Sequence, residues 1–229
     1  MDLGLILLPV DTDEEQRLPQ RAYLALRQSI RTLHLAPGQM VRERDVVEAL
    51  GMSRTPVREA LVRLETEGWV QIIPRHGFLV NPLAADDLQQ MYEIVEGLDG
   101  MATALATTRT TAETLSSLEA TLQQQIEALD RNDLIKWAEL DDVFHLQIVK
   151  LSGNARLRDL VENYNDQLYR ARLYTINLRP KPTHSVEEHR SIFEAMRAGE
   201  AERARLQMQD HRRRARTEIL QVIRALHPM

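Results

Sequence analysis

The hydrophobic positions in the first third of the chain recur with helical spacing and are interrupted by turn residues. In residues 18–34 the apolar side chains lie three and four positions apart, which predicts an amphipathic helix. Pro37 and Gly38 end that pattern. A second helical pattern covers residues 44–50, and Gly51 follows it where glycine commonly ends a helix. The pattern therefore predicts two short helices joined by a loop.

A third helix and a hairpin complete this segment. Ser53 or Thr55 is in position to cap the helix, and Pro56 falls in its first turn, where a missing N–H is harmless. Gly68 ends the helix, and the segments WVQII and FLV, on either side of a turn at residues 74–77, predict two strands. Two helices joined by a tight turn and followed by a hairpin are typical of a winged helix-turn-helix.

Beyond residue 84 the hydrophobic pattern is helical almost to the end of the chain. Glycine is scarce, and breaker clusters such as Ser152-Gly153-Asn154 separate successive segments. Several antiparallel helices of this length can bury one common core. The expected helices span residues 85–107, 111–130, 132–151, 155–177, 186–197 and 200–226.

These patterns predict a mostly α protein with two folded parts. An N-terminal arm (residues 1–15) precedes a winged helix-turn-helix domain (residues 16–80), and a linker (residues 81–84) leads to an all-helical antiparallel bundle (residues 85–229). The arm contains an apolar run that is too short to cross a membrane and follows Asp2 rather than a basic residue. Neither a membrane span nor a signal peptide is therefore expected.

The charge distribution separates the two folded parts. The whole chain has a net charge of −5, but residues 16–82 contain ten Arg and six acidic residues and so carry +4, which leaves −9 for the remainder. A basic module joined to an acidic body is expected of a protein with one phosphate-binding part. The chain contains no Cys, which excludes disulfides and thiolate chemistry and suits a cytoplasmic protein.

The third predicted helix carries residue types that suit DNA recognition. Arg54 and Arg58 are four positions apart and share a helix face, opposite the apolar stripe. Arginine can form two parallel hydrogen bonds with guanine O6 and N7. Ser53 and Thr55 can bond phosphate or a base edge, and Arg44 on the preceding helix can reach the DNA backbone. Each of these residues alone would also fit a solvated surface, so the DNA-binding interpretation depends on the whole set.

At the tip of the predicted wing, His76 and Gly77 form a small turn that can enter a minor groove. The run ERDVVEALGMSRTPVREALVRLETEGWVQIIPRHGFLV resembles the GntR family of bacterial transcription regulators, and the resemblance covers residues 18–80. It implies binding to double-stranded operator DNA. The DNA contacts that it implies are Arg44, Ser53, Arg54, Thr55, Arg58, His76 and Gly77.

Four residues in the helical part form a candidate metal site. Asp141 and His145 lie one turn apart on one predicted helix. Gly199 lies between His189 and His211, and a chain reversal there would place the two imidazoles about 15 and 18 Å from the turn, nearly level on antiparallel helices. Three imidazoles and one carboxylate suit Zn, Ni or another divalent transition ion. Spacing alone leaves open the alternative that each histidine is an ordinary surface or core residue.

The helical part also resembles a known domain. Residues 83–229 resemble the C-terminal FCD domain of the FadR-type branch of the GntR family, through the motifs DDVFHLQIVKLSGN, EEHRSIFEAMRAGEAERA and QDHRRR. The resemblance implies a helical bundle that binds a small organic or sugar acid with the help of a metal ion. The metal ligands that it implies are Asp141, His145, His189 and His211.

The chain departs from this family pattern in its first FCD helix. Val95 and Asp99 occupy positions where the family often has Arg and Glu, so a usual partner for the effector's carboxylate is missing. Arg170 and Arg172 can replace the lost charge. The alternative is that some of these candidates only face solvent. The candidate effector-binding residues are Arg170, Arg172, Asn163 and Tyr164.

The expected function is a sequence-specific DNA-binding transcription regulator, controlled by a small carboxylate effector at a metal-containing helical domain. A homodimer is expected, since two recognition helices match a two-fold operator. One alternative is a metal-responsive regulator in which the ion itself is the signal. A metalloenzyme is a third hypothesis, because an Asp/His₃ site can activate water, but no general base is evident nearby and no enzyme is expected.

Overall fold

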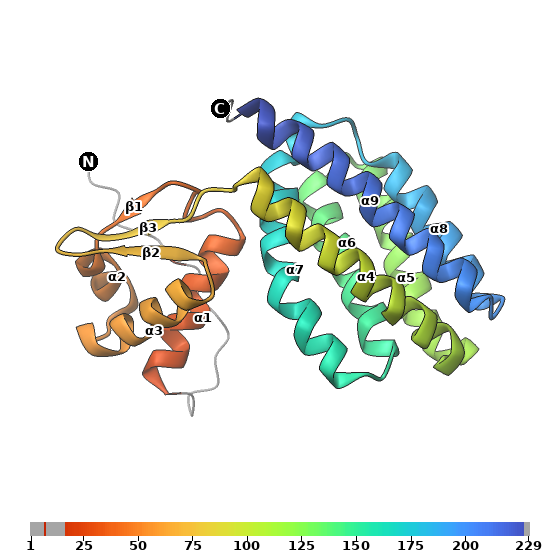
Figure 1. Ribbon diagram of the computed structural model, residues 1–229, viewed down its shortest axis with the longest axis horizontal. Helices are drawn as coiled ribbons and strands as arrows, with labels where there is room; N and C mark the ends of the chain where they lie inside the picture. Colours follow the sequence, from red (N-terminus) through yellow and green to blue (C-terminus); the bar gives the residue numbers. More distant parts are fainter. Residues whose placement is uncertain (1–6, 8–16, 227–229) are drawn as a thin grey trace. The chain divides into compact units, whose positions relative to one another are not determined.

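The computed structural model describes residue 7 and residues 17–226 (Figure 1). The chain divides into two compact units, Met1–Leu83 and Ala84–Met229. The arm predicted for residues 1–15 lies outside the described residues, apart from Leu7. Within the described ranges, no helix has the length and hydropathy needed to cross a membrane.

The N-terminal unit is a winged helix-turn-helix. Its sheet has the strand order β1-β3-β2 with both pairs antiparallel, so the predicted hairpin is part of a three-stranded sheet. The additional strand, β1, is only two residues long and pairs Met40 with Leu79. The elements are α1 (Leu18–Arg31), β1 (Met40–Val41), α2 (Glu43–Leu50), α3 (Arg54–Thr66), β2 (Val70–Ile73) and β3 (Gly77–Val80).

A single apolar core holds this unit together. Leu26 and Ile30 of α1 pack with Val57 and Leu64 of α3 and with Phe78 of β3, and all five side chains are fully buried. Burying a side chain of this size contributes roughly 1.5–3 kcal/mol. The buried stripe of α3 consequently fixes its opposite face toward solvent.

Two positions depend on local backbone geometry. Gly77 has φ +119°, and a Cβ there would lie 2.1 Å from the carbonyl oxygen of Val41, so only glycine allows β1 to pass this close to β3. Ser53 occupies the N-cap position of α3, but its side chain makes no capping hydrogen bond. The expected Ser53 cap is therefore absent.

The C-terminal unit is the predicted helical bundle. Figure 1 shows its long helices running side by side, and α4 packs along α9. Side-chain caps at Thr111, Asp133 and Asn154 accept the first free backbone N–H groups of three of the helices. The elements are α4 (Ala85–Arg109), α5 (Ala112–Asp130), α6 (Leu134–Leu151), α7 (Ala155–Thr175), η1 (Ile176–Leu178), α8 (Thr183–Arg197) and α9 (Ala201–Leu226).

The turn between α8 and α9 forms as the sequence predicts. Gly199 has φ +74°, a left-handed conformation that glycine adopts without strain. The chain reverses there, and α8 packs against α9. Residues on the two helices at similar distances from Gly199 are thereby brought together.

The segment between the two units is short and partly bound. Residues 81–84 separate β3 from α4. The first of them, Asn81, donates its backbone N–H to Trp69 O at 3.0 Å and its side-chain Nδ2–H to Gly68 O at 2.9 Å. Asn81 is therefore held by the N-terminal unit, and only residues 82–84 are left to connect it to the bundle.

Candidate DNA-binding surface and candidate metal centre

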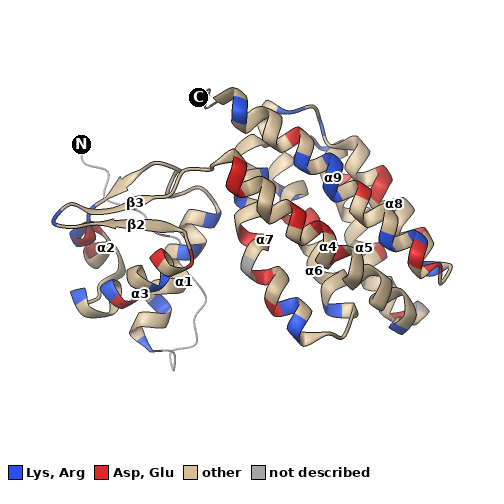
Figure 2. Cartoon of the chain, in the orientation of Figure 1, with Lys and Arg blue, Asp and Glu red and all other residues tan. Residues whose placement is uncertain are grey.

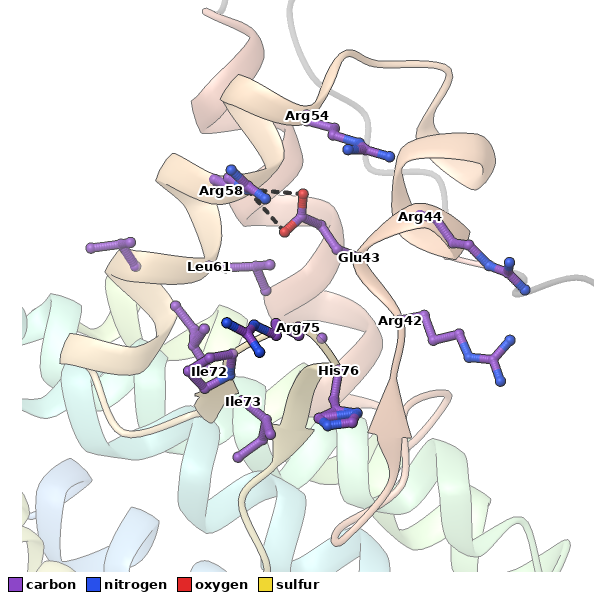
Figure 3. A pocket seen from close by; sticks show the side chains of 13 residues that line it. Arg42, Glu43, Arg44, Arg54, Arg58, Leu61, Ile72, Ile73, Arg75 and His76 are labelled. Carbon is purple, nitrogen blue, oxygen red and sulfur yellow. Dashed lines mark hydrogen bonds and ion pairs between the residues drawn. The ribbon is translucent and has the colours of Figure 1, made fainter.

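A basic groove lies between α3, the start of α2 and the wing (Figure 3). Its volume is about 680 Å³. Figure 2 shows basic residues along α3 and at the turn between β2 and β3. The arginines that line the groove are Arg42, Arg44, Arg54, Arg58 and Arg75.

Helix α3, the recognition helix of the motif, presents its two predicted arginines to this groove. Arg54 and Arg58 are exposed, and Figure 3 shows both side chains directed into the groove, away from the buried stripe of α3. The Nε–H of Arg58 donates to both carboxylate oxygens of Glu43, at 2.9 and 3.0 Å. Arg44 is also exposed and donates from Nε to Asp45 Oδ1 at 3.1 Å. Thr55 is exposed near the start of α3.

The wing supplies the other wall of the groove. His76 and Gly77 lie where the hairpin turns, as their predicted role requires. The neighbouring Arg75 is in the left-handed region with φ +69°. Sequence reasoning missed Arg75 and Arg42 as groove residues. The signal for Arg75 was present, since it falls in the same turn as His76.

The four predicted metal ligands meet inside the bundle. Asp141 and His145 come from α6, His189 from α8 and His211 from α9, and all four side chains are buried. One donor atom from each lies within 4.8 Å of the others. The Nε2 atom of His211 is 3.3 Å from Nε2 of His189 and 3.2 Å from Nε2 of His145. Three imidazole nitrogens thus point at one location.

The outward nitrogens of two imidazoles are held by acceptors. His189 Nδ1 lies 2.8 Å from Gln125 Oε1, while Gln125 Nε2 donates to Leu140 O at 3.0 Å. Because that second bond fixes the amide, Oε1 faces the imidazole and Nδ1 must be the donor. His211 Nδ1 likewise donates to Glu188 Oε2 at 2.7 Å. Both rings therefore turn an unprotonated Nε2 inward, which is the arrangement found in metal-binding histidines.

The protonation states also suit metal ligands. Burial, followed by the nearby Arg212 charge, lowers the pKa of His145 well below its usual value, and burial does the same to the pKa of His189. Burial alone would raise the pKa of Asp141, but Arg172, whose Nη2 is 3.0 Å from Asp141 Oδ2, acts together with His189, His211 and Arg212 to outweigh burial, and the pKa is lowered. At neutral pH the group consists of neutral imidazoles and an ionised carboxylate.

The spacing fits a divalent transition ion. Ligands about 2.0 Å from a tetrahedral ion lie about 3.3 Å apart, which agrees with the two distances between imidazole nitrogens. The carboxylate is slightly farther away: Asp141 Oδ1 is 3.7 Å from His189 Nε2, and Oδ2 is 3.9 Å from His145 Nε2. The donor set of three nitrogens and one oxygen suits Zn or Ni.

Comparison with protein families matches both units. The model described as "Bacterial regulatory proteins, gntR family" matches residues 18–80, and the one described as "FCD domain" matches residues 90–214. An uncharacterized HTH-type transcriptional regulator in an unstable DNA locus of Streptomyces ambofaciens is 34% identical over 198 residues, which cover 83% of this chain and 80% of the relative. The chain belongs to the GntR family.

Other GntR-family relatives agree with this assignment. The HTH-type transcriptional repressor RspR of Escherichia coli strain K12 is 28% identical, and the alignment covers 86% of each chain. Among solved structures, E. coli McbR/YncC has a TM-score of 0.79 at 24% identity, with 90% of this chain and 99% of that chain covered, and so shows the same fold. The protein is a DNA-binding transcriptional regulator of the GntR family with an FCD domain, not an enzyme.

The two candidate effector-binding arginines do not face solvent in this GntR-family protein. Arg170 and Arg172 are both buried, and burial lowers the pKa of Arg170 to about 10. Tyr164 is only half-buried, and the side chain of Asn163 lies outside the part of the structure that is described. Val95, which replaces the usual family Arg, is fully buried in the bundle.

Other helices supply the positive charge that α4 lacks because Val95 stands where the family often has Arg. Asp99 accepts from Arg212 Nε at 2.7 Å, so α9 supplies a cation close to Asp99 on α4. Arg172 on α7 supplies a second cation, which pairs with Asp141 of α6. Sequence reasoning did not single out Arg212, because an arginine within the run QDHRRR reads equally well as a solvated residue.

Proposed function

We propose that this GntR-family regulator responds to a small organic or sugar acid that binds beside a divalent metal ion in its helical bundle. The proposed ligands of the ion, Zn or Ni, are Asp141, His145, His189 and His211. One observation carries the proposal: three buried Nε2 atoms converge on one location, and two of the rings are held in the metal-binding tautomer by Gln125 and Glu188.

The charge inside the bundle favours an anionic effector. Four arginine side chains and three aspartate side chains lie buried or nearly so, giving a formal charge of +1 before any ion binds. A divalent ion adds two positive charges in a region of low dielectric constant, and a carboxylate ligand would offset part of the excess. The side chains are those of Arg170, Arg172, Arg179, Arg212, Asp99, Asp141 and Asp142.

Three donors are available to such a carboxylate. Tyr92 Oη, Arg172 Nη1 and Arg179 Nη2 are buried, and none has a hydrogen-bond partner among the described residues. Burial raises the pKa of Tyr92, and the charges of Arg172 and Arg179 act against that rise, which places the three groups within electrostatic range of one another. Buried donors without partners are costly, so an acceptor that satisfies them is stabilised. Of the predicted effector contacts, Arg172 is retained, and Tyr92 and Arg179 are added.

A homodimer is part of the proposal. On α4, Ile94 and Met101 are exposed apolar side chains about two helical turns apart on one face, and Leu98 between them is only partly buried. An apolar stripe of this kind suits a self-complementary contact between two copies of the bundle. Two copies would present two recognition helices to a two-fold operator in the bacterial cytoplasm.

The metal centre is tested by elemental analysis of the purified protein. His189→Ala is expected to lower the metal content, because it removes one of four ligands. His184→Ala is the matched control, since His184 lies on the same helix with its side chain 77% exposed. Equal metal content in the wild type and the His189 variant would contradict the ligand set.

The effector is tested on metal-loaded and metal-stripped protein with a panel of organic and sugar acids. A ligand that binds the folded state raises the melting temperature, and the same acid should then change operator binding in a gel-shift assay. If metal alone changes operator binding and no acid adds to it, the ion itself is the signal, which is the alternative function. If neither has any effect, the regulatory proposal is wrong.

A further inference from the structure

Glu43 is the only acidic residue among the described residues that line the basic groove. A carboxylate on a surface that binds phosphates is repelled by the DNA and lowers affinity for any duplex. Its side chain is nevertheless 23% exposed and directed into the groove (Figure 3). A residue with that electrostatic disadvantage needs a compensating role.

The contact that Glu43 makes indicates the role. Both of its carboxylate oxygens accept from Arg58 Nε, at 2.9 and 3.0 Å, although Arg58 lies on the next helix and is 65% exposed. No described residue bonds the terminal nitrogens of Arg58. The Nη1 and Nη2 edge of the guanidinium, which pairs with guanine O6 and N7, is thus left open to the groove.

The other arginines of the groove are not held in this way. Among the described residues, the ion-pair partner of Arg44 is its sequence neighbour Asp45. For Arg42, Arg54 and Arg75, the described residues supply no hydrogen-bond or ion-pair partner to the side chain. Within the part of the chain that the structure describes, Arg58 is the one groove arginine held across the turn of the helix-turn-helix motif. Its partner, Glu43, occupies the first position of α2, where the helix dipole stabilises a carboxylate.

We propose that Glu43 determines operator specificity by holding Arg58 in position for a base. An arginine side chain has considerable rotamer freedom, and fixing it before binding reduces the entropy lost when it pairs with guanine. The carboxylate also prevents Arg58 from turning to a phosphate. Arg58 therefore adds no affinity for a DNA sequence that lacks the matching base. Glu43 therefore weakens binding to wrong sequences more than to the operator.

Two probes are needed to test this proposal. The first is the duplex that wild-type protein selects from a randomised pool, and the second is duplex DNA of heterogeneous sequence. The specificity ratio is the affinity for the first divided by the affinity for the second, measured at several salt concentrations. Two variants separate charge from geometry: Glu43→Gln removes the charge, and Glu43→Asp keeps it on a side chain too short to hold Arg58 in the same way.

Each variant has a distinct expected result. Glu43→Gln should bind heterogeneous duplex more tightly, with the slope of log affinity against log salt steeper by about one, because Arg58 becomes free to contact a phosphate. Its specificity ratio should fall about 10-fold, the contribution of one good arginine–guanine pair. Glu43→Asp should lose specificity to a similar extent without gaining affinity for heterogeneous duplex.

The matched control is Glu48→Gln, which removes the same charge from an exposed position of α2 outside the groove. It should leave the specificity ratio unchanged. Retained binding to heterogeneous duplex shows that each variant is folded. The proposal is overturned if Glu43→Gln behaves like Glu48→Gln, or if the pool selected by Glu43→Gln shows the same base preferences as the wild type.

Discussion

Replacing Arg172 by methionine should destabilise the metal-free bundle much more than the metal-loaded bundle. Arg172 Nη2 lies 3.0 Å from Asp141 Oδ2, and the exposed fractions of the two side chains are 6% and 3%. Arg172→Met keeps a long apolar side chain but leaves Asp141 buried without this cation. Breaking a buried ion pair in this way costs about 3–5 kcal/mol.

A bound ion changes the outcome. In the metal-loaded protein the proposed ion lies against Asp141 and supplies the positive charge that the variant lacks. Since 1 kcal/mol shifts the melting temperature of a unit of this size by about 3 °C, the metal-free variant should melt roughly 10–15 °C below the wild type. The shift should be well under half of that when Zn is present.

The assay is thermal unfolding of the full chain followed by far-ultraviolet circular dichroism, with chelator and then with Zn. Arg170→Met is the control, because Arg170 is a buried arginine of the same helix and its Nη1 donates to Gln167 Oε1 at 3.5 Å. Its loss of stability should be the same with and without Zn. An Arg172→Met shift that Zn does not reduce would refute the argument that the ion and Arg172 balance the same carboxylate.

Three other predictions follow from the geometry. Gly77→Ala should destabilise the N-terminal unit by about 3 kcal/mol or more in urea unfolding, because a Cβ there overlaps Val41 O and φ is positive. Arg54→Ala should abolish detectable operator binding in a gel shift while circular dichroism remains unchanged, and wild-type affinity would remove Arg54 from the DNA contacts. The metal-free bundle should lose stability as pH falls below about 6.5, because the folded-state pKa values of His145 and His189 lie below their unfolded values and only the unfolded chain takes up protons there. Melting curves between about pH 8 and pH 5 check this, and a flat profile would contradict it.

The clustering of the four proposed ligands could be predicted because it depends on features that are visible in the sequence. Helical spacing placed Asp141 and His145 on one face, and a glycine at position 199 made a reversal the simplest way to bring His189 level with His211. Both are local properties of the chain, one a period and the other a left-handed backbone conformation. The structure has both.

Other parts of the sites could not be found in this way. The strand β1 has two residues, too few for an alternating pattern, and exists only because β3 is beside it. The holding of Arg58 by Glu43 and the burial of Arg172 arise from packing between helices. A charged residue in a sequence gives no sign of whether a partner helix will cover it, so the solvent-facing alternative for Arg172 was wrong.

The attachment of Asn81 to the backbone of Trp69 and Gly68 leaves a very short linker between the DNA-binding unit and the helical bundle. Three residues reach no farther than about 11 Å even when fully extended, and Pro82 restricts them further. If the proposed effector moves the first turn of α4 by more than this reach, the movement has to displace Asn81 and the backbone of Trp69 and Gly68 to which it bonds. The number of residues between Asn81 and α4 therefore limits how far the two units can move independently, and inserting glycines after Pro82 should uncouple the proposed effector response from operator binding while both units stay folded.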